Sequence, residues 1–225
     1  MTQKKHKLID RYYKESYEVI FRNILSSSNN GYYDEAALPS YTHSNKLMAW
    51  LFWNRVSCAF NLFPSDKNIK TVLDFGCGGG ITFKAFHTLG IKVTGCDIEH
   101  QNLAQTITQK LDISTTIVKT LDSIEENSMD CIFALDVLEH IENLDEYIEK
   151  LKRVSKPNAV WILSGPTENI FYKAGRLLAG FSGHYHCRNI YQIEKAFETK
   201  SLHRETAKTL YWPIPLFRVS RWICP

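Results

Sequence analysis

A glycine-rich run, with an aspartate just before it, is the clearest sign of a ligand-binding site in this sequence. Residues 69–75 include Ile69, Thr71 and Val72 and are typical of a strand, and a G-x-G-x-G run from Gly76 to Gly80 follows directly. Glycine allows a tight turn and a close approach to a ligand, because no Cβ intervenes. A dinucleotide loop, G-x-G-x-x-G, would need glycine where Ile81 stands, and no lysine follows to make a phosphate-binding P-loop. With Asp74 at the strand end, the loop instead favours a ligand with a cationic, amino-acid-like end.

A second acidic residue follows the next predicted strand. Gly95-Cys96-Asp97-Ile98-Glu99 places Asp97 about 20 residues beyond the glycine run, at the end of that strand. A carboxylate in this position can accept hydrogen bonds from both hydroxyls of a ribose. The two motifs together therefore predict a ligand that carries a nucleoside.

These motifs resemble those of class I S-adenosylmethionine-dependent methyltransferases, in particular the methyltransferase type 11 group that includes ubiquinone-biosynthesis-type O-methyltransferases. The resemblance runs from about Ile69 to Pro166 and more loosely to residue 212. It implies S-adenosylmethionine as cofactor and S-adenosylhomocysteine as product. The cofactor-binding residues that it implies are Asp74, Gly76, Cys77, Gly78, Gly80, Asp97, Ile98, Leu121, Asp122 and Asp136.

The resemblance also implies a role for each of these groups. Asp74 and the loop backbone would frame the methionyl end, Asp97 would bind the ribose, and Ile98 would pack on the adenine. Leu121 or Asp122 would lie beside the adenine.

A third motif, residues 129–141, is also typical of the group. Asp136 follows the predicted fourth strand at the mouth of the site, where a carboxylate can lie near the sulfonium or the substrate. Glu139 and His140 come three and four positions later, on one helical turn. An imidazole pKa lies near neutrality, so His140 is the first candidate for moving a proton. The alternative, that His140 only orients the loop by hydrogen bonding, remains open.

Residues 166–190 are predicted to form an insertion that covers the strand ends as a lid. His184 and His186 are further candidates for a catalytic base. The basic residues of this segment are Lys173, Arg176 and Arg188. They favour an anionic or phosphorylated acceptor, although a solvated basic face with packing histidines explains them equally well. The H-x-H-C pattern also suggests metal ligation, but no carboxylate or cysteine pair stands nearby, so we expect no metal site.

The elements that must position these residues alternate regularly from residue 69 onward. Helices are expected at 8–25 and 44–62, then before Gly90, and at 100–111, 143–155 and 190–200. Strands are expected at 69–75, 91–96, 115–119, 131–135 and 159–164. This order predicts a doubly wound α/β domain with a mostly parallel sheet, helices on both faces and the ligand at the carboxyl ends of the strands. The resemblance implies seven strands in a Rossmann-like methyltransferase fold, with residues 1–64 as a helical cap on a 65–225 domain.

The aromatic segment 210–223 has two interpretations. The first is that it forms the last strands of the sheet. The second is that it lies at a membrane surface, giving peripheral contact beside an amphiphilic substrate.

The composition narrows the function classes. The chain has 225 residues, 44% hydrophobic and 23% charged, which excludes a disordered chain or a disulfide scaffold. A net charge of +3 and the absence of an N/D-P-P-Y/W motif argue against a nucleic-acid substrate. The six cysteines stand singly, and no apolar stretch follows the N-terminal lysines, so a cytoplasmic location is expected. The apolar run 47–53 is too short to cross a bilayer.

The sequence therefore predicts methyl transfer to a small-molecule or lipid-like acceptor, at oxygen. An NAD-dependent oxidoreductase is the rival enzyme, and the missing third glycine argues against it. A non-catalytic S-adenosylmethionine-binding protein is the rival of a different class. The oligomeric state stays open.

Overall fold

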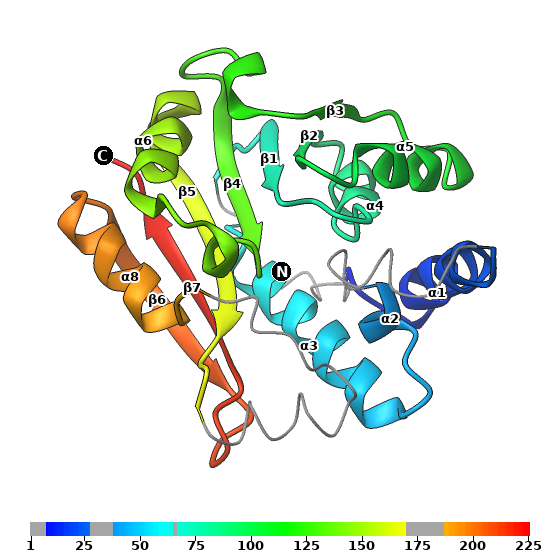
Figure 1. The fold of residues 1–225 in the computed structure, drawn as a ribbon. Helices are drawn as coiled ribbons and strands as arrows, with labels where there is room; N and C mark the ends of the chain where they lie inside the picture. The colour runs from blue at the N-terminus through cyan, green and yellow to red at the C-terminus, as the bar shows by residue number, and fades with distance from the viewer. Residues whose placement is uncertain (1–7, 28–37, 65–66, 170–186) are drawn as a thin grey trace, which may run out of the picture.

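The computed structural model describes residues 8–27, 38–64, 67–169 and 187–225. Over these ranges the chain forms a seven-stranded sheet in the order β3-β2-β1-β4-β5-β7-β6, with helices on both faces (Figure 1). Neighbouring strands from β3 to β5 are parallel, and β7 is antiparallel to both β5 and β6. The predicted doubly wound, mostly parallel sheet is confirmed.

The strands and helices lie close to the predicted ranges. The strands are β1 (Thr71–Phe75), β2 (Lys92–Cys96), β3 (Thr116–Val118), β4 (Met129–Leu135), β5 (Ser155–Pro166), β6 (His203–Leu210) and β7 (Phe217–Ile223). The α-helices are α1 (Arg11–Ser26), α2 (Leu38–Tyr41), α3 (Lys46–Leu62), α4 (Phe83–Thr88), α5 (Gln101–Lys110), α6 (Leu144–Val154) and α8 (Ile190–Thr199). Two short 3₁₀ helices are η1 (Leu121–Ser123) and η2 (Leu138–His140). None of the helices in the described ranges is long and apolar enough to span a membrane.

The C-terminal segment contributes strands, as the first of its two interpretations predicted. β7 pairs with β5 along its length, with Trp222 opposite Trp161. β6 was not expected from the sequence. Most of its residues are exposed at the edge of the sheet, so no apolar alternation marks it as a strand.

Side chains alternate between the two faces of the sheet and form two cores. Val72 and Phe133 belong to the core under α1, α3, α4 and α5, whereas Leu73 and Trp161 belong to the core under α6 and α8. Each central strand is therefore covered on both faces, which explains its continuous apolar sequence.

The N-terminal helices share the first of these cores with the sheet. The ring of Phe60 in α3 lies 5.2 Å from that of Phe133 in β4. In α1, the buried stripe of Tyr13, Tyr17 and Phe21 faces Trp53 and the start of α4. The division at residue 64 stays a prediction, but helices α1 to α3 pack directly against the strands that carry the motifs.

Candidate active site

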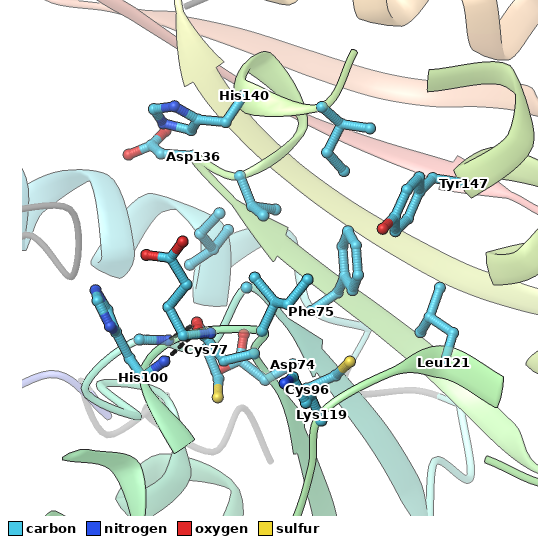
Figure 2. A pocket seen from close by; sticks show the side chains of 18 of the residues that line it. Asp74, Phe75, Cys77, Cys96, His100, Lys119, Leu121, Asp136, His140 and Tyr147 are labelled. Carbon is cyan, nitrogen blue, oxygen red and sulfur yellow. Dashed lines mark hydrogen bonds between the residues drawn. The ribbon is translucent and has the colours of Figure 1, made fainter. Parts of the chain in front are cut away.

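One cavity of about 660 Å³ opens at the carboxyl ends of β1, β2 and β4. This volume lies within the usual range for a small-molecule site. Nine of the ten predicted cofactor residues line it, as does His140 (Figure 2). These nine are Asp74, Gly76, Cys77, Gly78, Asp97, Ile98, Leu121, Asp122 and Asp136. Gly80 is not among the described lining residues, because its carbonyl lies on the side of the loop that faces α1.

The glycine loop is closed by backbone hydrogen bonds. The amide of Gly76 donates to the Cys96 carbonyl at 2.8 Å, and the amide of Gly80 donates to the Cys77 carbonyl at 2.7 Å. Gly76 has a φ of +70°, and a Cβ there would overlap the side chain of Val137. Only glycine fits this position without displacing the β4 end of the site.

Asp74 is a buried carboxyl group at the base of the loop, only 3% exposed. The Thr82 hydroxyl donates to its Oδ2 at 2.5 Å. Burial raises the pKa of Asp74 to about 7, the Thr82 hydrogen bond lowers it, and the charge of Asp97 raises it. A cationic group placed beside Asp74 would restore its ionised form, so the position suits an ammonium.

Asp97 joins the loop to the beginning of α5. Its Oδ2 accepts from the Gly78 amide at 2.8 Å, and its Oδ1 accepts from the amides of Glu99 and His100 at 3.0 and 2.8 Å. An ionised carboxylate offers about four acceptor sites, so capacity remains for a hydroxyl from the cavity. Next to it, the Ile98 side chain is 61% exposed and offers apolar surface to a flat ring.

Leu121 and Asp122 also line the cavity and lie in η1, which follows β3. Arg153 of α6 holds this turn by donating to the Leu121 carbonyl at 2.7 Å. Leu121 and Asp122, predicted to lie beside the adenine, therefore line the cavity from a 3₁₀ turn that Arg153 holds in place.

Asp136, directly after β4, has a φ of +54°, which is uncommon for a residue other than glycine. Its Oδ1 accepts from the Ser164 hydroxyl at 2.9 Å, and its Oδ2 forms an ion pair with Arg55 of α3. The carboxylate is thus held from two sides at the cavity wall.

Sequence reasoning did not identify Arg55, although it lines the cavity and is only 2% exposed. Its Nη2 donates to the Tyr41 hydroxyl at 3.1 Å, and its guanidinium lies 5.0 and 4.9 Å from the ring centroids of Phe52 and Phe217. The available signal was a single charge inside the apolar run of α3, since a buried guanidinium requires a partner.

Glu139 and His140 were predicted to share one helical turn, and they lie in η2 with opposite environments. Glu139 is 1% exposed and its Oε2 has no hydrogen-bond partner among the described residues, whereas His140 is exposed. Burial raises the pKa of Glu139 to about 8, while its backbone hydrogen bond and Arg55 lower it and Glu168 raises it. Glu139 therefore carries a proton at neutral pH.

The histidine candidates divide between described and undescribed parts of the chain. His140 and Asp136 line the same cavity, and both are labelled in Figure 2. His184 and His186 lie outside the described residues, as do Lys173 and Arg176. No group of three metal-ligating side chains occurs within the described ranges.

Arg188, at the end of the predicted lid, is described. Its guanidinium donates to the backbone carbonyls of Ile141 and Glu142, the latter at 3.0 Å. This arginine therefore anchors the loop that follows η2.

The sequence matches known methyltransferases in its central part. Residues 73–163 match the family model described as "Methyltransferase domain". The chain is 33% identical over 107 residues to the ubiquinone biosynthesis O-methyltransferase of Rickettsia typhi, covering 46% of this chain and 44% of that protein. It is 32% identical over 99 residues to the same enzyme of Paraburkholderia phymatum, covering 41% and 42%. The match spans less than half the length of these relatives.

Solved structures share the fold over most of the chain. A Pyrococcus horikoshii OT3 protein superposes with a TM-score of 0.69 at 16% identity, covering 88% of this chain and all of that one. The magnesium protoporphyrin IX methyltransferase of Synechocystis PCC 6803, solved with bound S-adenosylhomocysteine, superposes with a TM-score of 0.65 at 18% identity over 93% of this chain.

The cavity fits the cofactor of this family. Its base holds a buried carboxyl suited to an ammonium, its loop leaves no room for a Cβ at Gly76, and its second strand ends in a carboxylate with free acceptor capacity. The motifs and the domain match identify residues 73–163 as a class I S-adenosylmethionine-dependent methyltransferase domain, with S-adenosylmethionine as its cofactor, and the solved structures share its fold.

Proposed function

We propose that this protein transfers the methyl group of S-adenosylmethionine to an oxygen of a small-molecule or lipid-like acceptor. The observation that carries the proposal is the carboxylate of Asp136, held at the cavity wall by Arg55 and Ser164, with His140 lining the same cavity. The partial similarity to ubiquinone biosynthesis O-methyltransferases supports oxygen as the accepting atom.

On the cofactor side, each residue has one proposed task. Asp74 pairs with the ammonium of the methionyl end, Asp97 accepts from the ribose hydroxyls, and Ile98 covers one face of the adenine. Leu121 or Asp122 borders the adenine. When bound, S-adenosylmethionine supplies an electrophilic methyl group on a sulfonium sulfur. The contribution of the protein is then to align the acceptor oxygen with that methyl group and to exclude water.

On the acceptor side, Asp136 and His140 have separate proposed tasks: Asp136 orients the acceptor and His140 accepts its proton. Asp136 is ion-paired with Arg55, which stabilises its ionised form and makes it a weak base. We therefore assign Asp136 to orient the acceptor by accepting a hydrogen bond from its hydroxyl group. A ring nitrogen of His140 takes the proton, because His140 lines the cavity and an imidazole can exchange a proton near neutral pH. His184 and His186 are the alternative bases.

The basic segment 166–190 is proposed as a lid that favours an anionic acceptor. Since Arg188 donates to two backbone carbonyls, this preference would depend on Lys173 and Arg176. Replacing both by glutamine is expected to weaken the use of an anionic acceptor more than that of a neutral analogue, as measured by kcat/KM. Equal losses would contradict the proposed lid.

Peripheral membrane contact is the second proposed feature, and exposed aromatic side chains favour it. Trp212 is 83% exposed and Ile214 43%, next to Trp50, whose ring lies 5.6 Å from that of Tyr211. In flotation with liposomes, the wild type is expected to rise with the vesicles and Trp212→Ser to rise less. A wild type that stays with the soluble fraction would contradict membrane contact. We also propose a cytoplasmic location, since all six cysteines are free thiols.

Turnover with isotope-labelled S-adenosylmethionine tests the function. The protein is incubated with host metabolite and lipid extracts, and the product is identified by mass and by the chemical shift of the new methyl group. A methoxy signal that disappears in Asp97→Ala is the expected result, with Tyr12→Phe, far from the cavity, as control. A methyl group on nitrogen or carbon would contradict the proposed acceptor atom. Binding of S-adenosylhomocysteine without any turnover would favour the non-catalytic alternative, and binding of NADH would favour the oxidoreductase.

A further inference from the structure

The outer side of the glycine loop is held by a helix far away in sequence. In α1, the Tyr17 hydroxyl donates to the Gly80 carbonyl at 2.7 Å, and the Tyr13 hydroxyl donates to the Ile81 carbonyl. Both tyrosines are buried, with 0% and 4% of their surface exposed. The loop that lines the cavity on one side is thus bonded to α1 on the other.

The Tyr17 hydroxyl also accepts a hydrogen bond from the first turn of α4. The Thr82 side chain, at the N-cap of α4, makes no capping bond, and its hydroxyl donates to Asp74. First-turn amides of a helix need an acceptor from outside the helix. The Tyr17 hydroxyl provides one, accepting from the Lys84 amide at 3.3 Å. Thr82 and Tyr17 therefore bond the start of α4 from two sides, Thr82 to Asp74 and Tyr17 to Lys84.

Apolar and polar contacts continue this interface along the loop. A Cβ on Gly79 would lie 3.0 Å from the Leu38 side chain and 3.3 Å from that of Phe21, so α1 and α2 pack tightly on the loop backbone. The Lys84 ammonium donates to the Ser16 hydroxyl at 2.8 Å. Helix α1 lies on the same face of the sheet as α4 and α5 (Figure 1).

We propose that α1 is part of the cofactor site and that Tyr13 and Tyr17 are positioning residues for the glycine loop. They hold the carbonyls of residues 80 and 81, and thereby keep the shape in which Gly76 to Gly79 line the cavity. Without these bonds the loop leaves that shape for part of the time, and the apparent dissociation constant rises by the inverse of the competent fraction. Coupling between two sites is reciprocal, so the cofactor also stabilises the docking of α1.

Isothermal titration with S-adenosylhomocysteine tests the proposal, because it does not depend on methyl transfer. Tyr17→Phe removes one hydroxyl and nothing else, and is expected to weaken binding about fivefold or more. Tyr13→Phe is expected to act in the same direction, and the double variant more strongly than either. The matched control is Tyr12→Phe in the same helix, where the side chain is 78% exposed and binding should not change. Variants that melt at lower temperature but bind as tightly as the wild type would overturn the proposal.

Hydrogen exchange on the wild type provides the second measurement and needs no variant to fold. Saturation with S-adenosylhomocysteine is expected to slow amide exchange in residues 11–26 as well as in the loop. Protection of the loop alone would overturn the proposed coupling. If Tyr17→Phe weakens S-adenosylhomocysteine binding as expected but the wild type methylates no acceptor, the proposed function is contradicted. This inference then still stands.

Discussion

Arg55 of α3 forms an ion pair with Asp136, which follows β4, and this contact joins the N-terminal helices to the end of the sheet where the cavity opens. The two side chains are 3% and 18% exposed, so neither charge is well solvated. The same guanidinium donates to Tyr41, which also lines the cavity. The N-terminal helices therefore supply part of the cavity wall and hold Asp136 in it.

Removing the charge of Arg55 is expected to destabilise the fold. Arg55→Met leaves Asp136 without its partner and should lower the free energy of unfolding by about 3 kcal/mol, measured by urea denaturation. Arg55→Lys should cost less, because lysine keeps the charge but has no second nitrogen for Tyr41. The double variant Arg55→Met/Asp136→Asn should lose less than the sum of the single losses, and additive losses would show that the two residues are not coupled.

Asp74→Asn is expected to stabilise the protein while abolishing cofactor binding. The pKa of Asp74 is raised to about 7, so the folded state favours the protonated form of this group. The stability that protonation contributes is complete below the unfolded pKa of about 4 and is lost as the pH rises through 7. The melting temperature of the variant should therefore exceed that of the wild type increasingly from pH 4 to 7, and level off above. A constant difference across this range would contradict the prediction.

The same ionisation should appear in binding. If an ammonium pairs with Asp74, wild-type affinity for S-adenosylhomocysteine is expected to fall as the pH decreases below about 7, by up to tenfold per unit. Titration between pH 5.5 and 8 measures this slope. An affinity independent of pH would mean that Asp74 does not bind the cationic end.

Alanine substitutions at Gly76 and Gly90 can distinguish the cost of a positive φ from the cost of a steric clash of the added Cβ. Gly76 and Gly90 have φ values of +70° and +68°, but a Cβ on Gly90 meets nothing within 4 Å, whereas one on Gly76 overlaps Val137. Gly90→Ala should cost only the left-handed strain, about 1 kcal/mol. Gly76→Ala should cost clearly more and should also lose S-adenosylhomocysteine binding. Equal losses of unfolding free energy would contradict the tight fit at Gly76.

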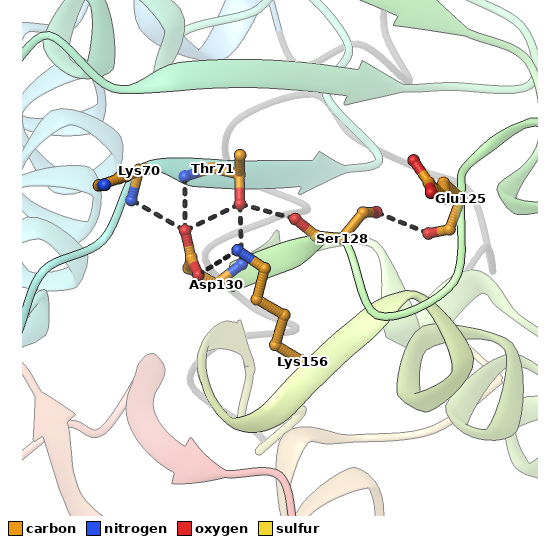
Figure 3. Close-up of polar contacts among 6 residues, drawn as sticks. All are labelled: Lys70, Thr71, Glu125, Ser128, Asp130 and Lys156. Carbon is orange, nitrogen blue, oxygen red and sulfur yellow. Dashed lines mark hydrogen bonds and ion pairs between the residues drawn. The ribbon is translucent and has the colours of Figure 1, made fainter.

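A third carboxyl, Asp130, is expected to affect stability without affecting the site. At the amino-terminal ends of β1 and β4, its Oδ2 accepts from the amides of Lys70 and Thr71 at 2.9 Å, and its Oδ1 pairs with Lys156 at 2.7 Å (Figure 3). Burial raises its pKa, but the bonds from Lys156, Lys70 and Thr71 outweigh burial and lower it to about 2.

The contribution of Asp130 is therefore present above about pH 4 and lost as the pH falls towards 2. Asp130→Asn should lower the free energy of unfolding by about 1–3 kcal/mol at pH 7, and the difference should shrink in acid. S-adenosylhomocysteine affinity should match the wild type, because the cavity lies at the opposite ends of these strands. Weaker binding in this variant would show that the two ends of β1 are coupled.

The cofactor half of the site was largely predictable because its signals are local. The glycine run and Asp97 each sit directly after a strand, and a strand end needs only its own apolar run to be recognised. Parallel pairing of β1 with β2 then brings both motifs to one edge. The spacing of glycines does not show which side of the loop each one faces, so the bond between Gly80 and α1 could not be predicted.

The side chains that hold Asp136 and the outer side of the glycine loop come from segments distant in sequence. Arg55, Tyr41 and Tyr17 come from helices whose patterns predict burial but do not name a partner. Their partners, Asp136 and the Gly80 carbonyl, are selected by how α1 and α3 pack against the sheet. The sequence alone thus determined the alternation of strands and helices from β1 to β5, the glycine loop and the resemblance to methyltransferases. Tertiary packing decided which buried polar groups meet, because a charge or a hydroxyl inside the fold is stable only where a distant segment supplies its partner.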